Sequence, residues 1–154
     1  MRGERGRLAE GASALRARAL RLLSRRDHSR QELARKLAPA APGDIEALLD
    51  ELQARGWLSD QRVAEQRLRA AAGRFGSRRV ARELTERGVA PEVVARASRR
   101  ARETELASAR AAWLKRFGKP AGSLRERARQ ARFLEQRGFD YEVIRQVLGG
   151  EFEA

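Results

Sequence analysis

The chain has 154 residues and a net charge of +13, from 34 Lys and Arg against 21 Asp and Glu, and all but three of the basic residues are arginine. The absence of cysteine excludes disulfides and thiolate zinc sites, and no apolar run approaches the roughly 20 residues that a membrane-spanning helix needs. Hydrophobic residues make up 42% of the chain, and the abundance of alanine, leucine, arginine and glutamate predicts an all-α protein.

The beginning of the chain predicts an arm and two helices. Residues 1–11 contain three glycines and no apolar period, which indicates a flexible N-terminal arm. From Ala12 to about Arg26, leucine and alanine follow helical spacing. The segment 29–32, Ser-Arg-Gln-Glu, is a capping box that begins a second helix, and this helix is expected to end before Pro39.

A third helix follows a turn over 39–43. Its apolar residues stand at i, i+3, i+4 and i+7 from Ile45, and it ends near Gly56. We expect Trp57 and Leu58 to fold back onto the core.

The rest of the chain predicts six more helices and a frayed tail over 150–154. No useful length of sequence alternates with period two, so no sheet is expected. A second capping box covers Ser123 to Glu126, and Leu124 is expected on the buried face of the helix that it begins. The helices are predicted near 60–72, 77–88, 91–101, 106–117, 124–138 and 141–148.

One sequence motif occurs three times and indicates an internal repeat. It consists of a leucine, an Arg-Gly pair, an apolar residue and then an acid, with the glycines at Gly56, Gly88 and Gly138. The glycine ends a helix in a left-handed conformation, and the acid lies in the first turn of the next helix. Because one helix pair cannot bury its own apolar face, we predict three tandem three-helix repeats that form an elongated curved array, over 12–60, 61–101 and 103–149.

No catalytic constellation stands out in the sequence, and no cofactor or metal is expected. The lone histidine, His28, could act as a general base, but a loop residue beside a helix cap is the favoured interpretation. Asp44, Glu46, Asp50 and Glu51 cluster on one predicted helix, where they could form a Mg²⁺ site but more simply form a solvated face. There is no phosphate-binding loop of the Walker type.

Arginine stripes are the strongest candidates for function. Residues 67–102 carry 11 basic and three acidic groups. Guanidinium groups suit both phosphates and carboxylates, although any one arginine could belong to an ordinary solvated surface. Aromatic residues are sparsely interleaved with the arginines, so base stacking of the kind found in single-strand binders is not strongly supported. The candidates are Arg25, Arg26 and Arg30, then Arg74, Arg78 and Arg82 with Arg79 alongside, and finally Arg125, Arg129 and Arg132.

Four segments in the right order give the chain a resemblance to the RecX family of recombination regulators. They are Ala19–Leu33, Leu52–Ala64, Phe75–Leu84 and Arg132–Phe139. The resemblance implies a cytoplasmic protein without enzymatic activity that binds the RecA–DNA filament in its groove. It also implies inhibition of the ATPase, co-protease and strand-exchange activities of RecA in DNA repair and the SOS response. Trp57, where the family has a smaller aromatic residue, and the arm over 1–11 depart from the family pattern.

The partner expected from this resemblance is the RecA nucleoprotein filament, bound by a monomer without any membrane. The basic stripes could also bind single- or double-stranded DNA, and the resemblance does not say which arginines would contact RecA and which DNA. The alternative is a tri-helical protein that binds nucleic acid directly, with steep salt dependence and no need for RecA. A weaker alternative is a nuclease or other enzyme that uses the acidic helix over 44–51.

Overall fold

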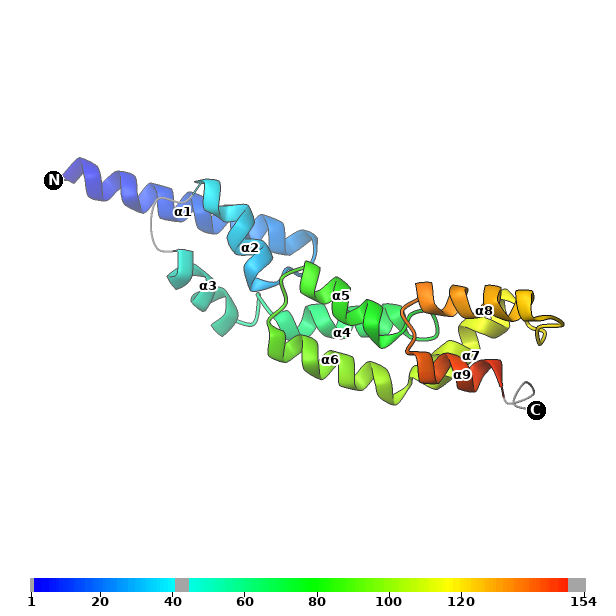
Figure 1. The fold of residues 1–154 in the computed structure, drawn as a ribbon. Helices are drawn as coiled ribbons and strands as arrows, with labels where there is room; N and C mark the ends of the chain where they lie inside the picture. Colours follow the sequence, from blue (N-terminus) through cyan, green and yellow to red (C-terminus); the bar gives the residue numbers. More distant parts are fainter. Residues whose placement is uncertain (1, 41–44, 150–154) are drawn as a thin grey trace. The chain divides into compact units, whose positions relative to one another are not determined.

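The computed structural model describes residues 2–40 and 45–149. In this part of the chain every regular element is helical, and no strand is present, which confirms the predicted all-α class (Figure 1). The elements are α1 Arg2–Arg25, α2 Arg30–Leu37, the 3-10 helix η1 Ala38–Ala40, α3 Ile45–Ala54, α4 Asp60–Ala71, α5 Ser77–Glu86, α6 Pro91–Glu103, α7 Glu105–Arg116, α8 Leu124–Gln136 and α9 Tyr141–Leu148.

Both predicted capping boxes are present. The Ser29 hydroxyl accepts a hydrogen bond from the backbone N–H of Glu32 at the start of α2, and Ser123 accepts one from Glu126 at the start of α8. Each serine thereby satisfies an N–H group that has no partner within its own helix.

The chain divides into two compact units. Unit 1 comprises Met1–Val63 together with the turn Arg87–Ala90, and unit 2 comprises Ala64–Glu86 and Pro91–Ala154. The core of unit 1 lies among α1, α2 and α3, where complete burial of a leucine contributes about 1.5–3 kcal/mol. Its buried residues are Ala19, Leu33, Leu37, Leu49, Leu52 and Leu58.

Unit 2 has its own core where α7, α8 and α9 meet. Phe139 and Leu134 are fully enclosed, and small alanines on α7 allow the helices to approach closely. The buried members of this cluster are Ala109, Ala112, Leu134, Phe139 and Ile144.

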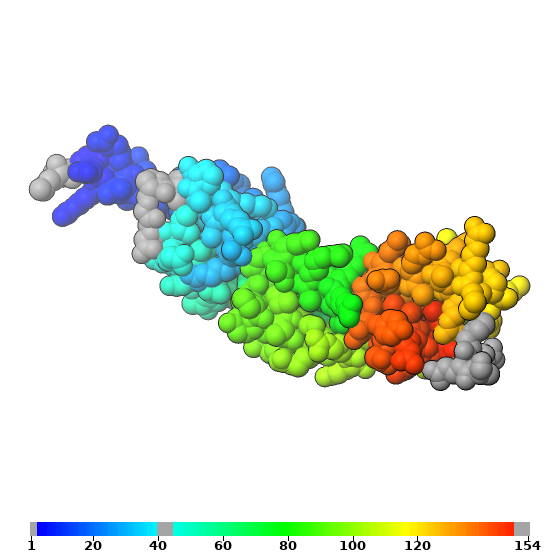
Figure 2. All heavy atoms as spheres, in the orientation of Figure 1, coloured from blue at the N-terminus to red at the C-terminus, as the bar shows by residue number. Residues whose placement is uncertain are grey.

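Several expectations about single segments are wrong. Helix α1 begins at Arg2, not at Ala12, and residues 3–14 are exposed along it, so the missing apolar period reflects a helix without packing partners. This half of α1 projects from the rest of unit 1 (Figure 2). Leu58 is buried as expected, but Trp57 is 42% exposed and Leu124 is 77% exposed. The tail 150–154 and Asp44 lie outside the described residues.

Only two of the three copies of the repeated motif occupy the same position within a three-helix group. Gly88 and Gly138 both lie in the turn between the second and third helices of a three-helix group, whereas Gly56 follows α3 and precedes α4. The apolar residues after Gly88 and Gly138, Val89 and Phe139, are 5% and 1% exposed, unlike Trp57 after Gly56. This difference explains the unequal spacing of the three copies along the chain.

The two equivalent glycines meet the start of another helix at very short range. Gly138 has φ of +85°, and a Cβ placed on it would lie 2.6 Å from the backbone nitrogen of Arg79 at the start of α5. Gly88 has φ of +74°, and its Cβ would lie 3.0 Å from the Cβ of Gln31 on α2. Gly56 has the same φ of +74°, but nothing lies within 4 Å of its Cβ position. Only the first two glycines are therefore required both by backbone conformation and by close approach.

We predict that Gly138→Ala lowers the free energy of unfolding far more than Gly56→Ala. The two substitutions share the strain of positive φ, about 1–2 kcal/mol, but only the alanine at position 138 forces α5 and the turn apart, which adds about 1–3 kcal/mol. Urea unfolding followed by circular dichroism measures both values. Equal losses in the two variants would show that close packing at Gly138 does not constrain the fold.

Candidate functional site

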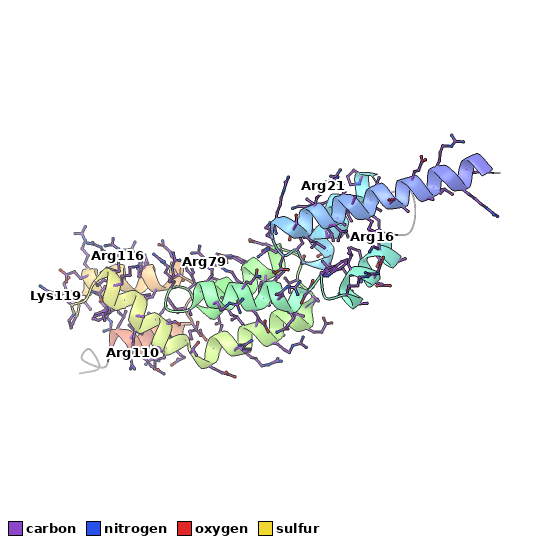
Figure 3. All side chains as sticks on the ribbon, turned by 180° about the vertical axis from the view of Figure 1, so that it is seen from behind. Arg16, Arg21, Arg79, Arg110, Arg116 and Lys119 are labelled. Carbon is purple, nitrogen blue, oxygen red and sulfur yellow. The ribbon has the colours of Figure 1, made fainter. Side chains whose placement is uncertain are left out.

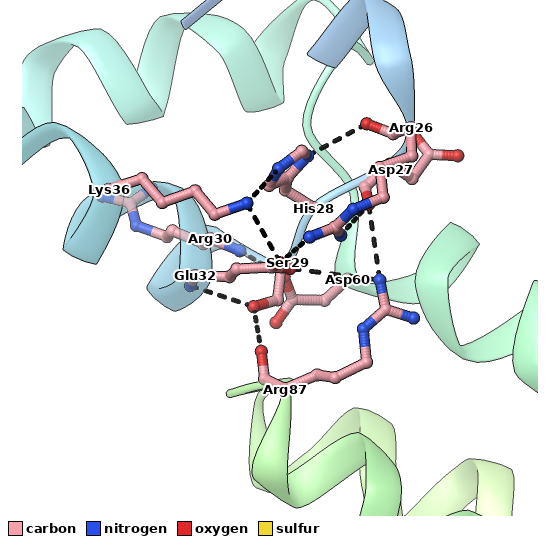
Figure 4. A network of polar contacts seen from close by, with 9 residues as sticks. All are labelled: Arg26, Asp27, His28, Ser29, Arg30, Glu32, Lys36, Asp60 and Arg87. Carbon is pink, nitrogen blue, oxygen red and sulfur yellow. Dashed lines mark hydrogen bonds and ion pairs between the residues drawn. The ribbon is translucent and has the colours of Figure 1, made fainter. Parts of the chain in front are cut away.

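The carboxylate of Asp60, at the start of α4, connects three segments of unit 1. Its Oδ1 accepts a hydrogen bond from the backbone N–H of Arg30 at 2.8 Å, and its Oδ2 accepts one from Ala90 at 2.8 Å. The Ser29 hydroxyl also donates to the carbonyl oxygen of Arg87 at 2.5 Å (Figure 4). The start of α2, the start of α4 and the turn 87–90 are thus joined by charge-assisted hydrogen bonds.

Unit 2 contains the same arrangement around Glu105, at the start of α7. Its Oε1 accepts hydrogen bonds from the backbone N–H of Ser77 at 3.0 Å and of Asp140 at 3.3 Å. The Gly76 N–H also donates to the carbonyl oxygen of Arg137 at 2.9 Å. Glu105 is only 3% exposed, so its charge is compensated by these donors. Sequence reasoning missed Glu105, because nothing in its local sequence separates it from an exposed first-turn acid.

His28 is a buried member of the network around Asp60, not a catalytic base. It is 2% exposed, with Nδ1 lying 3.0 Å from the carbonyl oxygen of Arg26 and Nε2 lying 3.0 Å from Nζ of Lys36. Because the Lys36 ammonium group can only donate, Nε2 accepts, and Nδ1–H donates to the carbonyl. Burial lowers the pKa of His28, and the positive charges of Arg26 and Lys36 act in the same direction.

The predicted arginines near the first turn are mostly held by acids. Arg26 pairs with Glu32. Burial raises the pKa of Glu32, but the hydrogen bond and charge of Arg26 outweigh this effect and lower the pKa overall. Arg30 lies 2.5 Å from Oε2 of Glu46 and 2.7 Å from Oδ1 of Asp50. Of this group only Arg25 is exposed without an ion pair to any described residue.

The acidic face of α3 is therefore a set of arginine partners. Glu46 and Asp50 bind Arg30, and Glu51 binds Arg16 and Arg55. Among the residues that the structure describes, no group of three or more His, Cys, Asp or Glu is placed to hold a metal ion. Nor does any described helix combine the length and the apolar character needed to cross a bilayer.

The predicted stripe on α5 is only partly a single helix face. Arg74 lies in the turn before α5, not on the helix. The Arg79 guanidinium lies 3.9 Å from the centroid of the Phe75 ring and pairs with Glu83 at 2.8 Å, so its place is structural. Arg78 is 67% exposed and pairs with Asp140 at 3.0 Å, while Arg82 is exposed.

Four guanidinium groups lie around the ring of Phe75. Their centres lie 3.9–5.4 Å from the ring centroid, a range in which each cation is attracted to the π system. The contributing residues are Arg67, Arg74, Arg79 and Arg137. No local pattern predicts this cluster, because Arg67 on α4 and Arg137 in the turn after α8 are far apart along the chain.

The three arginines predicted as a stripe on α8 are all at the surface. Arg125, Arg129 and Arg132 are exposed, and none forms an ion pair with a described residue. Two further cations missed by the sequence reasoning, Arg116 and Lys119, lie at the same end of unit 2 (Figure 3). Periodicity did not connect them with α8, because a turn separates the two segments.

Comparison with known proteins accounts for the three-helix groups. Family models described as the first, second and third three-helix domains of RecX match residues 16–52, 59–97 and 103–148. The chain belongs to the RecX family. Each matched segment covers one helix triplet, α1–α3, α4–α6 and α7–α9, so the prediction of three tandem three-helix repeats is confirmed.

Relatives and solved structures of RecX agree with this assignment. The regulatory protein RecX of Chromobacterium violaceum is 51% identical over 144 residues, which cover 92% of this chain and 93% of the relative. That of Leptothrix cholodnii is 50% identical, over 88% and 87% of the two chains. The crystal structure of RecX from Lactobacillus salivarius shares the fold with a TM-score of 0.78 at 17% identity, covering 91% of this chain and 96% of that one.

We predict that the free energy of unfolding falls as the pH drops below 6.5, because of His28. Its pKa in the folded protein is lower than the ordinary value of 6.5, so the unfolded chain binds the proton first. The stabilisation is complete above 6.5 and is lost as the pH falls toward the lowered pKa. Urea unfolding between pH 8 and pH 5 measures the change.

The titration of His28 can be followed directly, because it is the only histidine in the chain. Nuclear magnetic resonance should give an imidazole pKa below 6.5. His28→Asn retains a donor for the Arg26 carbonyl and should remove this part of the pH dependence. An imidazole pKa at or above 6.5 would contradict the buried neutral state.

Proposed function

We propose that the chain binds the RecA–DNA filament and inhibits the ATPase, co-protease and strand-exchange activities of RecA. Membership of the RecX family is the observation that carries this proposal. The residues add a physical means: arginines of unit 2 that stay exposed and lack carboxylate partners, on a chain of net charge +13.

The proposed binding surface, called here the cationic surface, consists of the exposed arginines predicted in unit 2. Of these only Arg78 has an ion-pair partner among the described residues, and that pair is open to solvent, where such pairs contribute little. Guanidinium groups can bind DNA phosphates or acidic side chains of a protein with paired hydrogen bonds. The members are Arg74, Arg78, Arg82, Arg125, Arg129 and Arg132.

Inhibition follows if one molecule contacts more than one filament subunit. A ligand that binds one arrangement of subunits more tightly than the others shifts the population toward that arrangement. ATP hydrolysis and strand exchange need the subunits to change their arrangement, so both slow down. No bond is made or broken by the regulator itself in this mechanism.

Direct binding to DNA is the competing explanation for any inhibition that is observed. A protein that only covers DNA would inhibit RecA by removing its substrate, and added free DNA would restore hydrolysis. A regulator bound to the filament would keep most of its effect when free DNA is added. A monomeric state and a cytoplasmic location remain predictions.

We predict that Arg78→Glu with Arg82→Glu raises the concentration needed for half-inhibition of RecA ATPase by roughly tenfold or more, equivalent to about 1.4 kcal/mol of binding energy. Both residues are exposed on α5, whereas Arg79 is left intact because it packs on Phe75. The measurement is steady-state ATP hydrolysis by RecA on single-stranded DNA.

The control is Arg5→Glu with Arg7→Glu, which makes the same change in net charge on the exposed first half of α1. It should leave the half-inhibition concentration within about threefold of the original value. Equal losses in the two double variants would show that total charge, and not the cationic surface, determines the inhibition.

A further inference from the structure

A pocket in unit 2 opens between the end of α7, the turn 117–123 and α8. Its volume is about 320 Å³, at the small end of the range for ligand sites. Three cations line it, together with an apolar wall of Phe117 and Pro120. The segment around the turn 117–123 lies at the surface of unit 2 in Figure 2.

The pocket has an excess of positive charge that the protein does not neutralise. Arg116, Lys119 and Arg129 line it, and none of them forms an ion pair with a described residue. The single acid in the lining, Glu126, accepts a hydrogen bond from the backbone N–H of Gly122 at 2.7 Å. Glu126 forms no ion pair with the three cations, and the lining keeps an excess of positive charge.

The walls of the pocket are fixed by hydrogen bonds and packing. Gln130, 6% exposed, donates from Nε2 to the carbonyl oxygen of Lys119 at 3.2 Å and accepts at Oε1 from Nε1 of Trp113 at 2.9 Å. The Phe117 ring packs edge-on against Phe133, with 5.3 Å between the centroids. The turn that carries Lys119 is therefore held in place before any ligand arrives, which lowers the entropy cost of binding.

We propose that this pocket binds one nucleotide of a single nucleic-acid strand. The phosphate lies among the three cations, and the base lies against the wall of Phe117 and Pro120. A phosphate alone would fill only a part of 320 Å³ and would not use the apolar wall. Arg125 and Arg132, exposed on α8 on either side of Arg129, continue the positive charge beyond the pocket, as adjacent phosphates of a strand require.

This proposal includes a base contact that the sequence alone did not strongly support. Aromatic residues make up only 5% of the chain, but the fold places Phe117 in one pocket with three cations, of which Arg116 lies 5.5 Å from the centroid of its ring. The proposal does not depend on RecA, so its test uses the full chain and DNA alone, and its failure would leave the proposed inhibition of RecA untouched.

The first test measures binding of a fluorescent 12-residue thymidine strand by anisotropy over a range of salt concentrations. The variant Arg116→Gln, Lys119→Gln, Arg129→Gln removes the three pocket cations. It should weaken binding at least tenfold at low salt, and it should reduce the slope of log affinity against log salt by about 0.7, the contribution of the one phosphate bound in the pocket.

The matched control is Arg99→Gln, Arg110→Gln, Lys115→Gln, which removes the same side-chain types from exposed positions of unit 2 outside the pocket. It should change affinity by less than threefold. Circular dichroism and the urea midpoint of each variant verify that the fold is intact. Equal weakening in the two triple variants would overturn the proposal, because it would show diffuse attraction to the whole unit.

The second test addresses the base and the source of the nucleotide. The original protein should bind the thymidine strand about fivefold or more tightly than an abasic strand of equal length, as one base–aromatic contact provides. Phe117→Leu should remove this preference while leaving the salt slope unchanged. Equal affinity for the two strands would overturn the base contact, and an affinity for ATP equal to that for the strand would assign the pocket to free nucleotide.

Discussion

The structure depends on two carboxylates, Asp60 and Glu105, each of which accepts hydrogen bonds from backbone N–H groups of two other segments. In both places the donors are N–H groups at or just before the start of a helix, which have no partner inside that helix. One acid therefore satisfies several unpaired donors at once. Removing it would leave these donors and the neighbouring polar atoms without partners, at about 1–3 kcal/mol for each buried group.

The hydrogen-bonded contacts around Asp60 and Glu105 also determine which arginines remain available to bind a partner. Arg26 and Arg30 lie next to the hydrogen bonds of Asp60 and are paired with acids of α2 and α3. Arg79 lies next to the glycine contact in unit 2 and is held by Phe75 and Glu83. Arg125, Arg129 and Arg132 on α8, and Arg82 on α5, form no ion pair with a described residue and stay exposed. Arg26, Arg30 and Arg79 are thus engaged within the fold, whereas these four arginines remain available to a partner.

A RecX protein acts by recognition and not by chemistry, and in this chain the histidine and the acids of α3 are engaged within the fold. The one histidine is neutral and buried, and the acids of α3 are paired with arginines. The cationic surface serves the proposed contact with the RecA filament. The pocket at Arg116, Lys119 and Arg129 would in addition bind one nucleotide. The two proposals share the arginines of α8, but their tests change different residues, so the proposals can succeed or fail separately.

The sequence by itself determined what depends on neighbours within one or two helical turns: most of the helices, the serine caps at Ser29 and Ser123, and the exposure of Arg125, Arg129 and Arg132 on α8. Its motifs also pointed to the RecX family. The sequence could not distinguish Gly56 from Gly88, because both glycines stand in the same motif. They also have the same φ, and they differ only in which residues from elsewhere in the chain approach them. Only the tertiary structure placed Glu105 against two helix starts and brought Lys119 to Arg129, since these contacts cross turns whose geometry no local periodicity encodes.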